Sequence, residues 1–190
     1  IEYEYETTVG AGLPVLNTLM EMQRNGDKVT QISGVVSGTM TYVFNELEKG
    51  KAFADTIAHA RELGSAEPDP RDDLSGEDVV RKFMILARTL NQRSERDEIQ
   101  VTSLVPEDLQ NSDVDTFMSY LPNYNDLWKE KMESAAKEDK TLRYVGRFED
   151  GNIKIGVEIL PKNSPLGQLK GTDNLVQIYT ERYSQSPIVI

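Results

Sequence analysis

The chain contains no cysteine, one histidine and one tryptophan. Without cysteine it can form no disulfide and cannot use a thiolate as a nucleophile or metal ligand, which fits a reducing compartment and leads us to expect a cytoplasmic protein. His59 falls on the exposed side of a predicted helix, so we interpret it as a surface residue and not as a general base. We interpret Trp128 as a packing residue rather than a cofactor platform.

Positive charge is also scarce, because 21 Lys and Arg face 32 Asp and Glu, for a net charge of −11. This balance argues against nucleic acid or an anionic membrane surface as a partner. No apolar run approaches the ~20 residues of a membrane-spanning helix, and no signal peptide is visible. The chain starts and stops inside strand-like apolar patterns, so we expect a domain excised from a longer protein.

What the sequence does contain is a series of helical and strand-like patterns, which in 190 residues predicts a single domain. Apolar spacing and capping residues predict helices over 13–25, 39–49, 53–63, 75–91, 114–121 and 125–139. In the third of these, Ile57, Ala60 and Leu63 are expected to face the core. Alternating patterns predict strands over 1–5, 28–36, 142–148, 153–160 and 175–183, a short strand within 95–105, and another that begins at 188.

These elements predict an α+β fold, with a mixed, largely antiparallel sheet of four to six strands and its helices mainly on one face. The other face of such a sheet needs cover. Several strands, such as the one that contains Val35 and Val36, are apolar at consecutive positions, so both faces are candidates for burial. We therefore predict that two copies of the chain pair through the open face of the sheet.

The most unusual stretch is an acidic segment, residues 64–82. Pro68 and Pro70 fix two φ angles within it and make it stiff. Ser75 is predicted to cap the helix that follows, with Asp78 in the acidic position of a capping box. Lys82 comes four residues after Asp78, so the two side chains share one face of that helix. The segment holds six carboxylates: Glu67, Asp69, Asp72, Asp73, Glu77 and Asp78.

Two interpretations of the acidic segment stay open from the residues alone. In the first, Asp78 caps the helix, forms an exposed pair with Lys82 worth roughly 0.3–0.5 kcal/mol, and leaves the other acids to water. In the second, the mutual repulsion of six carboxylates is offset by cations among them. Arg71, Arg81 and Lys82 are internal candidates, and the ammonium group of a ligand is an external one.

A long and specific pattern runs through this region, and it resembles the signature of the homoserine dehydrogenases. The matching residues are Ala60, Gly64, Asp69, Pro70, Asp73, Leu74, Gly76, Asp78 and Lys82. Ser65 departs from the signature, because the family usually has a large apolar or aromatic residue there, which would line the substrate pocket. T-V-G-A-G-L-P at 8–14, S-G-T-M-T-Y at 37–42 and L-R-Y-V-G at 142–146 extend the likeness over nearly the whole chain. It is strongest to the dehydrogenase half of bifunctional aspartokinase/homoserine dehydrogenases.

The resemblance implies an NAD(P)-dependent enzyme of amino-acid biosynthesis that interconverts L-aspartate 4-semialdehyde and L-homoserine. The site residues it implies are Lys82 as proton donor, Glu67, Asp73 and Asp78 for the substrate ammonium, and Gly38 and Thr39 for the substrate carboxylate. From the residues alone, Ser37-Gly38-Thr39 indicates first an ordinary Ser/Thr cap at the start of a helix, and a helix start that holds an anion is the alternative.

The glycine turn at residues 10–12 has no third glycine at the spacing of G-x-G-x-x-G, so it is not a dinucleotide-binding fingerprint. The residues alone indicate a tight turn before a helix. The resemblance adds that this turn holds a monovalent cation such as sodium. Its ligands would be Glu6 and the backbone carbonyls of Val9, Ala11 and Leu13, all of them oxygen donors that suit a hard cation.

The resemblance assigns residues 1–190 to a catalytic and dimerisation domain and implies a homodimer. It also implies that the nucleotide-binding domain, fused or docked, lies outside this sequence together with most of the cofactor site. We therefore expect this polypeptide alone to be inactive. Two alternatives remain, namely a catalytically silent dimerisation and docking module, and a dehydrogenase for a related amino-acid aldehyde.

Overall fold

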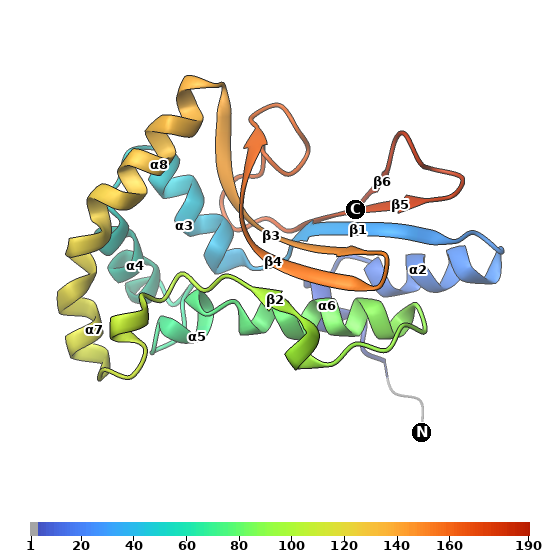
Figure 1. Ribbon diagram of the computed structural model, residues 1–190, viewed down its shortest axis with the longest axis horizontal. Coiled ribbons are helices and arrows are strands. Elements are labelled where there is room, and N and C mark those ends of the chain that lie inside the picture. The colour runs from blue at the N-terminus through green and yellow to red at the C-terminus, as the bar shows by residue number, and fades with distance from the viewer. Residues whose placement is uncertain (1–3) are drawn as a thin grey trace.

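The computed structural model describes residues 4–190 and contains a six-stranded mixed sheet in the order β2-β4-β3-β1-β5-β6 (Figure 1). The predicted strand over 1–5 falls mostly outside the described residues, and Glu4 and Tyr5 belong to no regular element. The strands are β1 (Val29–Val35), β2 (Gln100–Val101), β3 (Lys140–Glu149), β4 (Asn152–Pro161), β5 (Leu175–Thr180) and β6 (Ile188–Val189).

The α-helices agree with the predicted ranges to within two residues at each end, and two short helical turns, α1 and α5, were not predicted. They are α1 (Thr7–Gly10), α2 (Val15–Arg24), α3 (Gly38–Glu48), α4 (Phe53–Glu62), α5 (Arg71–Leu74), α6 (Glu77–Thr89), α7 (Val114–Tyr120) and α8 (Asn125–Lys137). Short 3₁₀ turns lie at η1 (Arg96–Glu98), η2 (Glu107–Leu109) and η3 (Leu121–Tyr124). No helix within residues 4–190 is both long and apolar enough to cross a membrane.

The sheet is largely antiparallel, as predicted. Central strand β1 pairs antiparallel with β3 and β5, β3 with β4, and β5 with β6, whereas the two-residue strand β2 pairs parallel with β4. A two-residue turn joins β3 to β4, and its residues Asp150 and Gly151 have φ of 50° and 80°. Positive φ at both positions is the signature of the turns that match the twist of a hairpin.

The helices lie mainly on one face of the sheet (Figure 1). α6 packs on β3 and β4, and α2 packs on β1, while α3, α4, α7 and α8 form a helical group at one end, where α3 and α8 contact β3. This confirms the predicted α+β class. Trp128 is buried against Phe44 and Phe53, with ring centroids 5.7 and 5.4 Å away, so its interpretation as a packing residue is confirmed as well.

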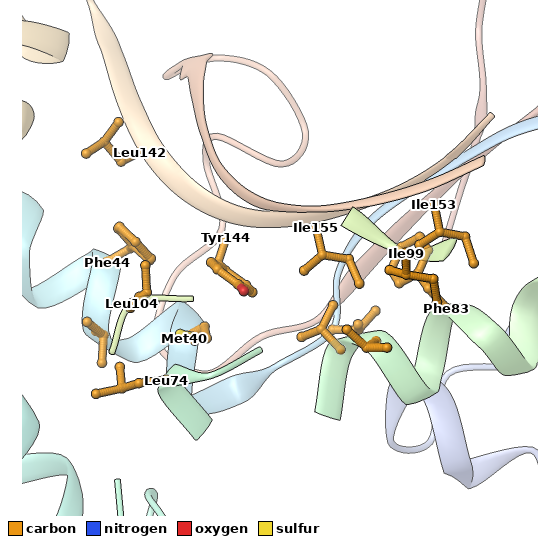
Figure 2. Close-up of a cluster of buried hydrophobic side chains, with 14 of the residues drawn as sticks. Met40, Phe44, Leu74, Phe83, Ile99, Leu104, Leu142, Tyr144, Ile153 and Ile155 are labelled. Carbon is orange, nitrogen blue, oxygen red and sulfur yellow. The ribbon is translucent and has the colours of Figure 1, made fainter. Parts of the chain in front are cut away.

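The core between sheet and helices is shown in Figure 2, where Phe83 of α6 points toward the strands. Phe83 is fully buried beneath Gly146 of β3, and a Cβ at that glycine would collide with the Phe83 ring. The missing side chain therefore lets α6 approach the sheet closely, which matters because α6 carries Asp78 and Lys82. Leu63, by contrast, is 57% exposed and not in the core as predicted, because α4 ends at Glu62 and the chain turns away at Gly64 with φ of 68°.

The other face of the sheet is partly covered by the same chain. The loop between β4 and β5, residues 162–174, lays Leu166 and Leu169 on Val35 and Val145. The adjoining part of this outer face is polar, and there Arg147 binds Glu158 with Nε–Oε1 and Nη2–Oε2 distances of 2.6 and 2.7 Å. The apolar pairs seen in the sequence are thus covered within the monomer.

Candidate active site

Helix α6 sets the direction of the two most important side chains. Asp78 and Lys82 do share one face, and Oδ2 of Asp78 lies 2.7 Å from Nζ of Lys82. The predicted capping box is wrong, because the N-cap lies one residue later than predicted. That N-cap is Gly76, which has φ of 81° and stands where a Cβ would collide with the Tyr144 hydroxyl. Ser75 Oγ instead donates to the Asp72 carbonyl at 3.0 Å and accepts from the Glu77 amide at 3.3 Å.

Lys82 is anchored at both sides of its amino group. Besides contacting Asp78, Nζ donates to the backbone carbonyl of Val36 at 2.7 Å, and the side chain is 19% exposed. Val36 is the residue after β1, two positions before α3, so this bond joins α6 to the start of α3. Lys82 thus differs from the exposed helix-face pair of the first interpretation, because its side chain is mostly buried and its amino group has two oxygen partners, although Asp78 is 45% exposed.

The start of α3 lies next to the acidic segment. Ser37 caps α3 as predicted, accepting from the Met40 amide at 3.3 Å. Thr39 Oγ1 donates to the carbonyl oxygen of Ser65 at 2.6 Å, which ties the first turn of α3 to the acidic segment. A cap and a ligand cradle are compatible here, because the Ser37 side chain satisfies only one of the free N–H groups at the helix start.

Arg71 and Arg96 bind two carboxylates of the acidic segment and so help to fix its conformation. Arg71 holds Asp69 through Nε–Oδ1 and Nη2–Oδ2 contacts of 2.9 and 2.6 Å, and Nη1 donates to the carbonyls of Leu109, Gln110 and Ser112. The guanidinium hydrogen bond lowers the pKa of the Asp69 carboxyl, against the opposing effect of its partial burial. In the same way, the hydrogen bond from Arg96 lowers the pKa of Glu77.

The remaining acids, Glu67, Asp72 and Asp73, have no cationic partner among residues 4–190. Asp73 Oδ2 accepts from the backbone amide of Glu67 at 2.8 Å, which fixes the chain between the two. The internal cations therefore neutralise Asp69, Glu77 and Asp78, while three neighbouring carboxylates remain unneutralised, as the second interpretation requires for an ammonium ligand.

These groups line two adjoining depressions that share Glu67 and Asp73. We call the first, of about 600 Å³, the acidic groove; it is lined by Thr39, Arg61, Gly64, Ser65, Ala66, Glu67, Pro68 and Asp73. The second adds Asp72 and Asp78. The structure thus brings Thr39, Glu67, Asp73 and Asp78 to one surface. Lys82 lies beside Asp78, and Gly38 is next to Thr39 at the start of α3.

The turn predicted to bind a cation has a different internal role that the sequence did not reveal. Glu6 Oε1 and Oε2 accept from the amides of Leu16 and Asn17 at 2.7 and 2.8 Å, so its carboxylate caps α2. The Leu13 carbonyl accepts from the Val15 amide at 2.9 Å, and Ala11 adopts a positive φ of 51°. A carboxylate or carbonyl oxygen that accepts one hydrogen bond keeps a further lone pair, so these bonds do not exclude a cation ligand. The described residues contain no group of three or more His, Asp or Glu side chains that could hold a metal ion.

Sequence reasoning missed three contributors to the site. Arg61 lines the acidic groove and places a positive charge beside Thr39 and Glu67. The Val36 carbonyl, as a backbone acceptor, leaves no mark in a side-chain pattern. Arg71 was considered only as a counter-ion, whereas its bonds to Leu109, Gln110 and Ser112 also tie the acidic segment to residues 38 to 41 positions away.

Comparison with known proteins assigns this arrangement to a family. The family model for homoserine dehydrogenase matches residues 14–190. The bifunctional aspartokinase/homoserine dehydrogenase 2 of Zea mays is 44% identical over 191 residues, which cover 99% of this chain and 21% of the maize protein. The homoserine dehydrogenase of Paracoccidioides brasiliensis is 40% identical over 198 residues, with 98% of this chain and 53% of that protein covered. The chain therefore belongs to the homoserine dehydrogenase family.

Solved structures have the same fold. A Candida auris protein of unknown function is 40% identical and superposes with a TM-score of 0.92 over 98% of this chain and 54% of that chain. A hyperthermophilic archaeal homoserine dehydrogenase in complex with NADPH, 23% identical, has the same fold with a TM-score of 0.69 over 97% of this chain and 47% of that chain. The chain thus spans from a fifth to about half of the length of these relatives.

Proposed function

We propose that this chain is the substrate-binding and catalytic domain of an NAD(P)-dependent homoserine dehydrogenase, which interconverts L-aspartate 4-semialdehyde and L-homoserine. One observation carries the proposal. Nζ of Lys82 is held 2.7 Å from Asp78 and 2.7 Å from the Val36 carbonyl, next to a surface of unneutralised carboxylates. A family member with this arrangement has a proton donor and an ammonium site in one place.

The amino-acid part of the substrate would be bound at both of its charges. Glu67, Asp73 and Asp78 would bind the ammonium group, because three carboxylates on one surface stabilise a positive charge, and within residues 4–190 neither Glu67 nor Asp73 forms an ion pair with a Lys or Arg. Gly38 and Thr39 would bind the carboxylate, because the first amides of α3 point out of a helix N-terminus. Arg61 adds positive charge on that side of the acidic groove.

Lys82 would handle the proton. NAD(P)H, when bound, supplies the hydride to the aldehyde carbon, and the carbonyl oxygen gains negative charge as the hydride arrives. The Lys82 ammonium would donate a proton to that oxygen and give the homoserine hydroxyl; in the reverse direction the neutral amine would take the proton back. Asp78 and the Val36 carbonyl hold Nζ in place for this transfer.

The remaining partners follow from the family and from the fold. The homoserine dehydrogenase family is NAD(P)-dependent, and we propose that a nucleotide-binding domain, fused or docked, supplies most of the cofactor site. Glu6 and the carbonyls of Val9, Ala11 and Leu13 would hold a monovalent cation such as sodium. We propose the cytoplasm as the compartment, since the chain has no cysteine.

We also propose a homodimer through the part of the outer sheet face that neither helices nor the 162–174 loop cover. Arg147 and Glu158 lie on this face, with side chains that are 32% and 28% exposed, and they make its exposed part polar. Its pairing would therefore rely on hydrogen bonds and ion pairs between the copies more than on apolar contacts.

The test compares wild type and Lys82→Ala in the full-length protein for reduction of aspartate 4-semialdehyde. Loss of a positioned proton donor should lower kcat by about 10²-fold or more with little change in KM. Lys49→Ala is the matched control, because Lys49 makes a similar helical pair with Glu46 at 2.6 Å but lies at the other end of α3. An unchanged kcat in Lys82→Ala would refute the proton-donor role, and an inactive wild type would refute the proposed activity.

A further inference from the structure

One buried charge of the chain has no part in the site described so far. Arg143 in β3 is only 2% exposed. Its Nη1 donates to Thr141 Oγ1 at 2.9 Å and to the Leu142 carbonyl at 2.8 Å. Its Nη2 lies 2.9 Å from Oε2 of Glu48, which balances the charge. Burying a guanidinium costs free energy unless the group is paired and hydrogen-bonded in this way. A buried arginine at this position therefore indicates a specific structural role.

Arg143 also holds the loop 162–174. Nη2 donates to the carbonyl of Gly167 at 2.7 Å and to that of Leu169 at 3.2 Å. Leu166 and Leu169 are buried on the outer face of the sheet, so the middle of the loop is fixed by one charged and two apolar anchors. Figure 1 shows this loop, in orange and red, between the end of β4 and the start of β5.

The far end of the same loop lies against the start of α3. The carbonyl of Thr172 is 3.2 Å from the position that a Cβ on Gly38 would take, so loop and helix are in close contact at that glycine. The next carbonyl, that of Asp173, accepts from Thr41 Oγ1 at 3.0 Å. Thr41 is 1% exposed and also donates to the carbonyl of Ser37, the cap of α3. The loop therefore connects Arg143 to the first turn of α3.

We infer that Arg143 is a positioning residue for the substrate carboxylate site, acting through the loop 162–174. It fixes the loop, and the loop holds Gly38 and the first turn of α3 in the orientation that aims their amides at the ligand. The inference rests on the proposed function, because it takes the start of α3 as the carboxylate site. Arg143 contacts the loop and not the substrate.

Arginine suits this task better than lysine. Two of its nitrogens reach five acceptors on three segments, β3, the Glu48 end of α3 and the loop. A lysine has a single nitrogen and cannot span these acceptors in the same fixed geometry. Arg143→Lys thus keeps the charge next to Glu48 and loosens the loop, which separates positioning from charge.

The first experiment measures hydrogen exchange of the full-length protein without ligands. Arg143→Lys should speed exchange about tenfold in residues 168–174 and in the first turn of α3 together. Arg88→Lys is the control, because Arg88 Nη2 also holds a loop carbonyl, that of Ser94, at 2.9 Å at the far end of α6. Faster exchange in the loop with no change in α3 would overturn the inference, whether or not the protein is a homoserine dehydrogenase.

The second experiment measures oxidation of homoserine. Arg143→Lys should raise KM for homoserine about tenfold and leave kcat within about twofold, because a displaced carboxylate site weakens binding before chemistry. An unchanged KM in an active enzyme would overturn the positioning role and leave the proposed function intact. A wild type without activity would refute the proposed function, and the exchange experiment would then still decide whether Arg143 orders α3.

A second, milder variant keeps the proposal testable if Arg143→Lys does not fold. Thr41→Val removes the hydroxyl that joins α3 to Asp173 and keeps the size of the side chain. It should raise KM for homoserine and speed exchange in the first turn of α3 in the same direction as Arg143→Lys. If Thr41→Val is folded and changes neither quantity, the connection from the loop to α3 does not position the site.

Discussion

At the scale of single residues, the site depends on how a few charges are divided between internal partners and the ligand. Arg71 and Arg96 bind Asp69 and Glu77, and Lys82 binds Asp78. This leaves Glu67 and Asp73 without a cation among residues 4–190, on the wall of the acidic groove. The acids of one short segment thus have separate tasks, some holding the segment in shape and others facing the ligand.

This division predicts the effect of Glu67→Gln in the full-length enzyme. A charge-assisted hydrogen bond is worth about 1.5–3 kcal/mol, so KM for homoserine should rise by about 10- to 100-fold with a smaller change in kcat. Steady-state kinetics at saturating cofactor measures this. Glu62→Gln, an exposed acid at the end of α4 outside the acidic groove, is the control. Equal KM values in Glu67→Gln and wild type would remove Glu67 from the ammonium site.

A second prediction at this scale concerns the contact between Gly146 and Phe83. The alanine Cβ of Gly146→Ala would collide with the fully buried Phe83 ring. Overpacking of this kind costs about 1–3 kcal/mol, so thermal unfolding should shift to lower temperature. Gly12→Ala is the control, because nothing lies within 4 Å of its added Cβ. Phe83→Leu combined with Gly146→Ala should recover part of the loss, and an unchanged midpoint in Gly146→Ala alone would contradict the close approach.

At the scale of elements, carboxylates hold several helix and loop ends in place, and the fold lowers the pKa of these carboxylates. Arg71 and Arg96 lower the pKa of Asp69 and of Glu77 by hydrogen bonding, and the Thr116 amide does the same for the pKa of Asp113 at the start of α7. Because the pKa of each of these carboxyls is lower in the folded than in the unfolded state, the ionised form stabilises the fold at pH values above the unfolded-state pKa. That unfolded-state pKa is near 4.

The prediction is that the free energy of unfolding stays level from pH 7 to about pH 5 and falls below about pH 4, as these carboxylates take up protons. Denaturant unfolding at a series of pH values measures this. In Glu77→Gln the fall should be smaller than in wild type, because one of the groups that binds extra protons on unfolding is gone. A fall of the same size in Glu77→Gln would show that the pair with Arg96 does not contribute.

The elements themselves were largely predictable from the sequence, and the reasons differ from one to another. The helical spacing over 75–91 and the alternating patterns over 142–148 and 153–160 are local signals, and both are confirmed by α6, β3 and β4. The start of α6 was not predictable, because Gly76 is required there by its φ and by the Tyr144 hydroxyl, a partner almost seventy residues away. The contact of Lys82 with the Val36 carbonyl also depends on tertiary structure.

At the scale of the whole molecule, the sheet separates a helix-covered face that supports the site from an outer face with mixed cover. The 162–174 loop covers the apolar part of that face, and the polar part around Arg147 and Glu158 stays partly exposed. This differs from the sequence-based expectation of an apolar face, since consecutive apolar residues in β1 and β3 are covered within the same chain.

The dimer proposal predicts that the full-length protein sediments at twice its monomer mass at micromolar concentration. Tyr179 of β5, paired with Gln31, lies on the outer face, so Tyr179→Glu should shift the equilibrium to monomer by adding an unpaired charge there. Tyr120→Glu, at the exposed end of α7, should leave it unchanged. A wild type that sediments as a monomer would count against pairing through this face.

The position of β1 at the centre of the sheet has a consequence for how the chain folds. Ser33 pairs with Arg147 and with Gln177, so the central strand finds its neighbours only after more than a hundred further residues. At a synthesis rate of roughly 5–20 residues per second, β1 leaves the ribosome several seconds before β3 exists. Folding of this kind is slow, because the chain must lose the conformational entropy of closing long loops before the contacts between the strands can form. During that interval the apolar residues of β1 are uncovered, which makes the nascent chain a substrate for chaperones until the β3–β4 hairpin arrives.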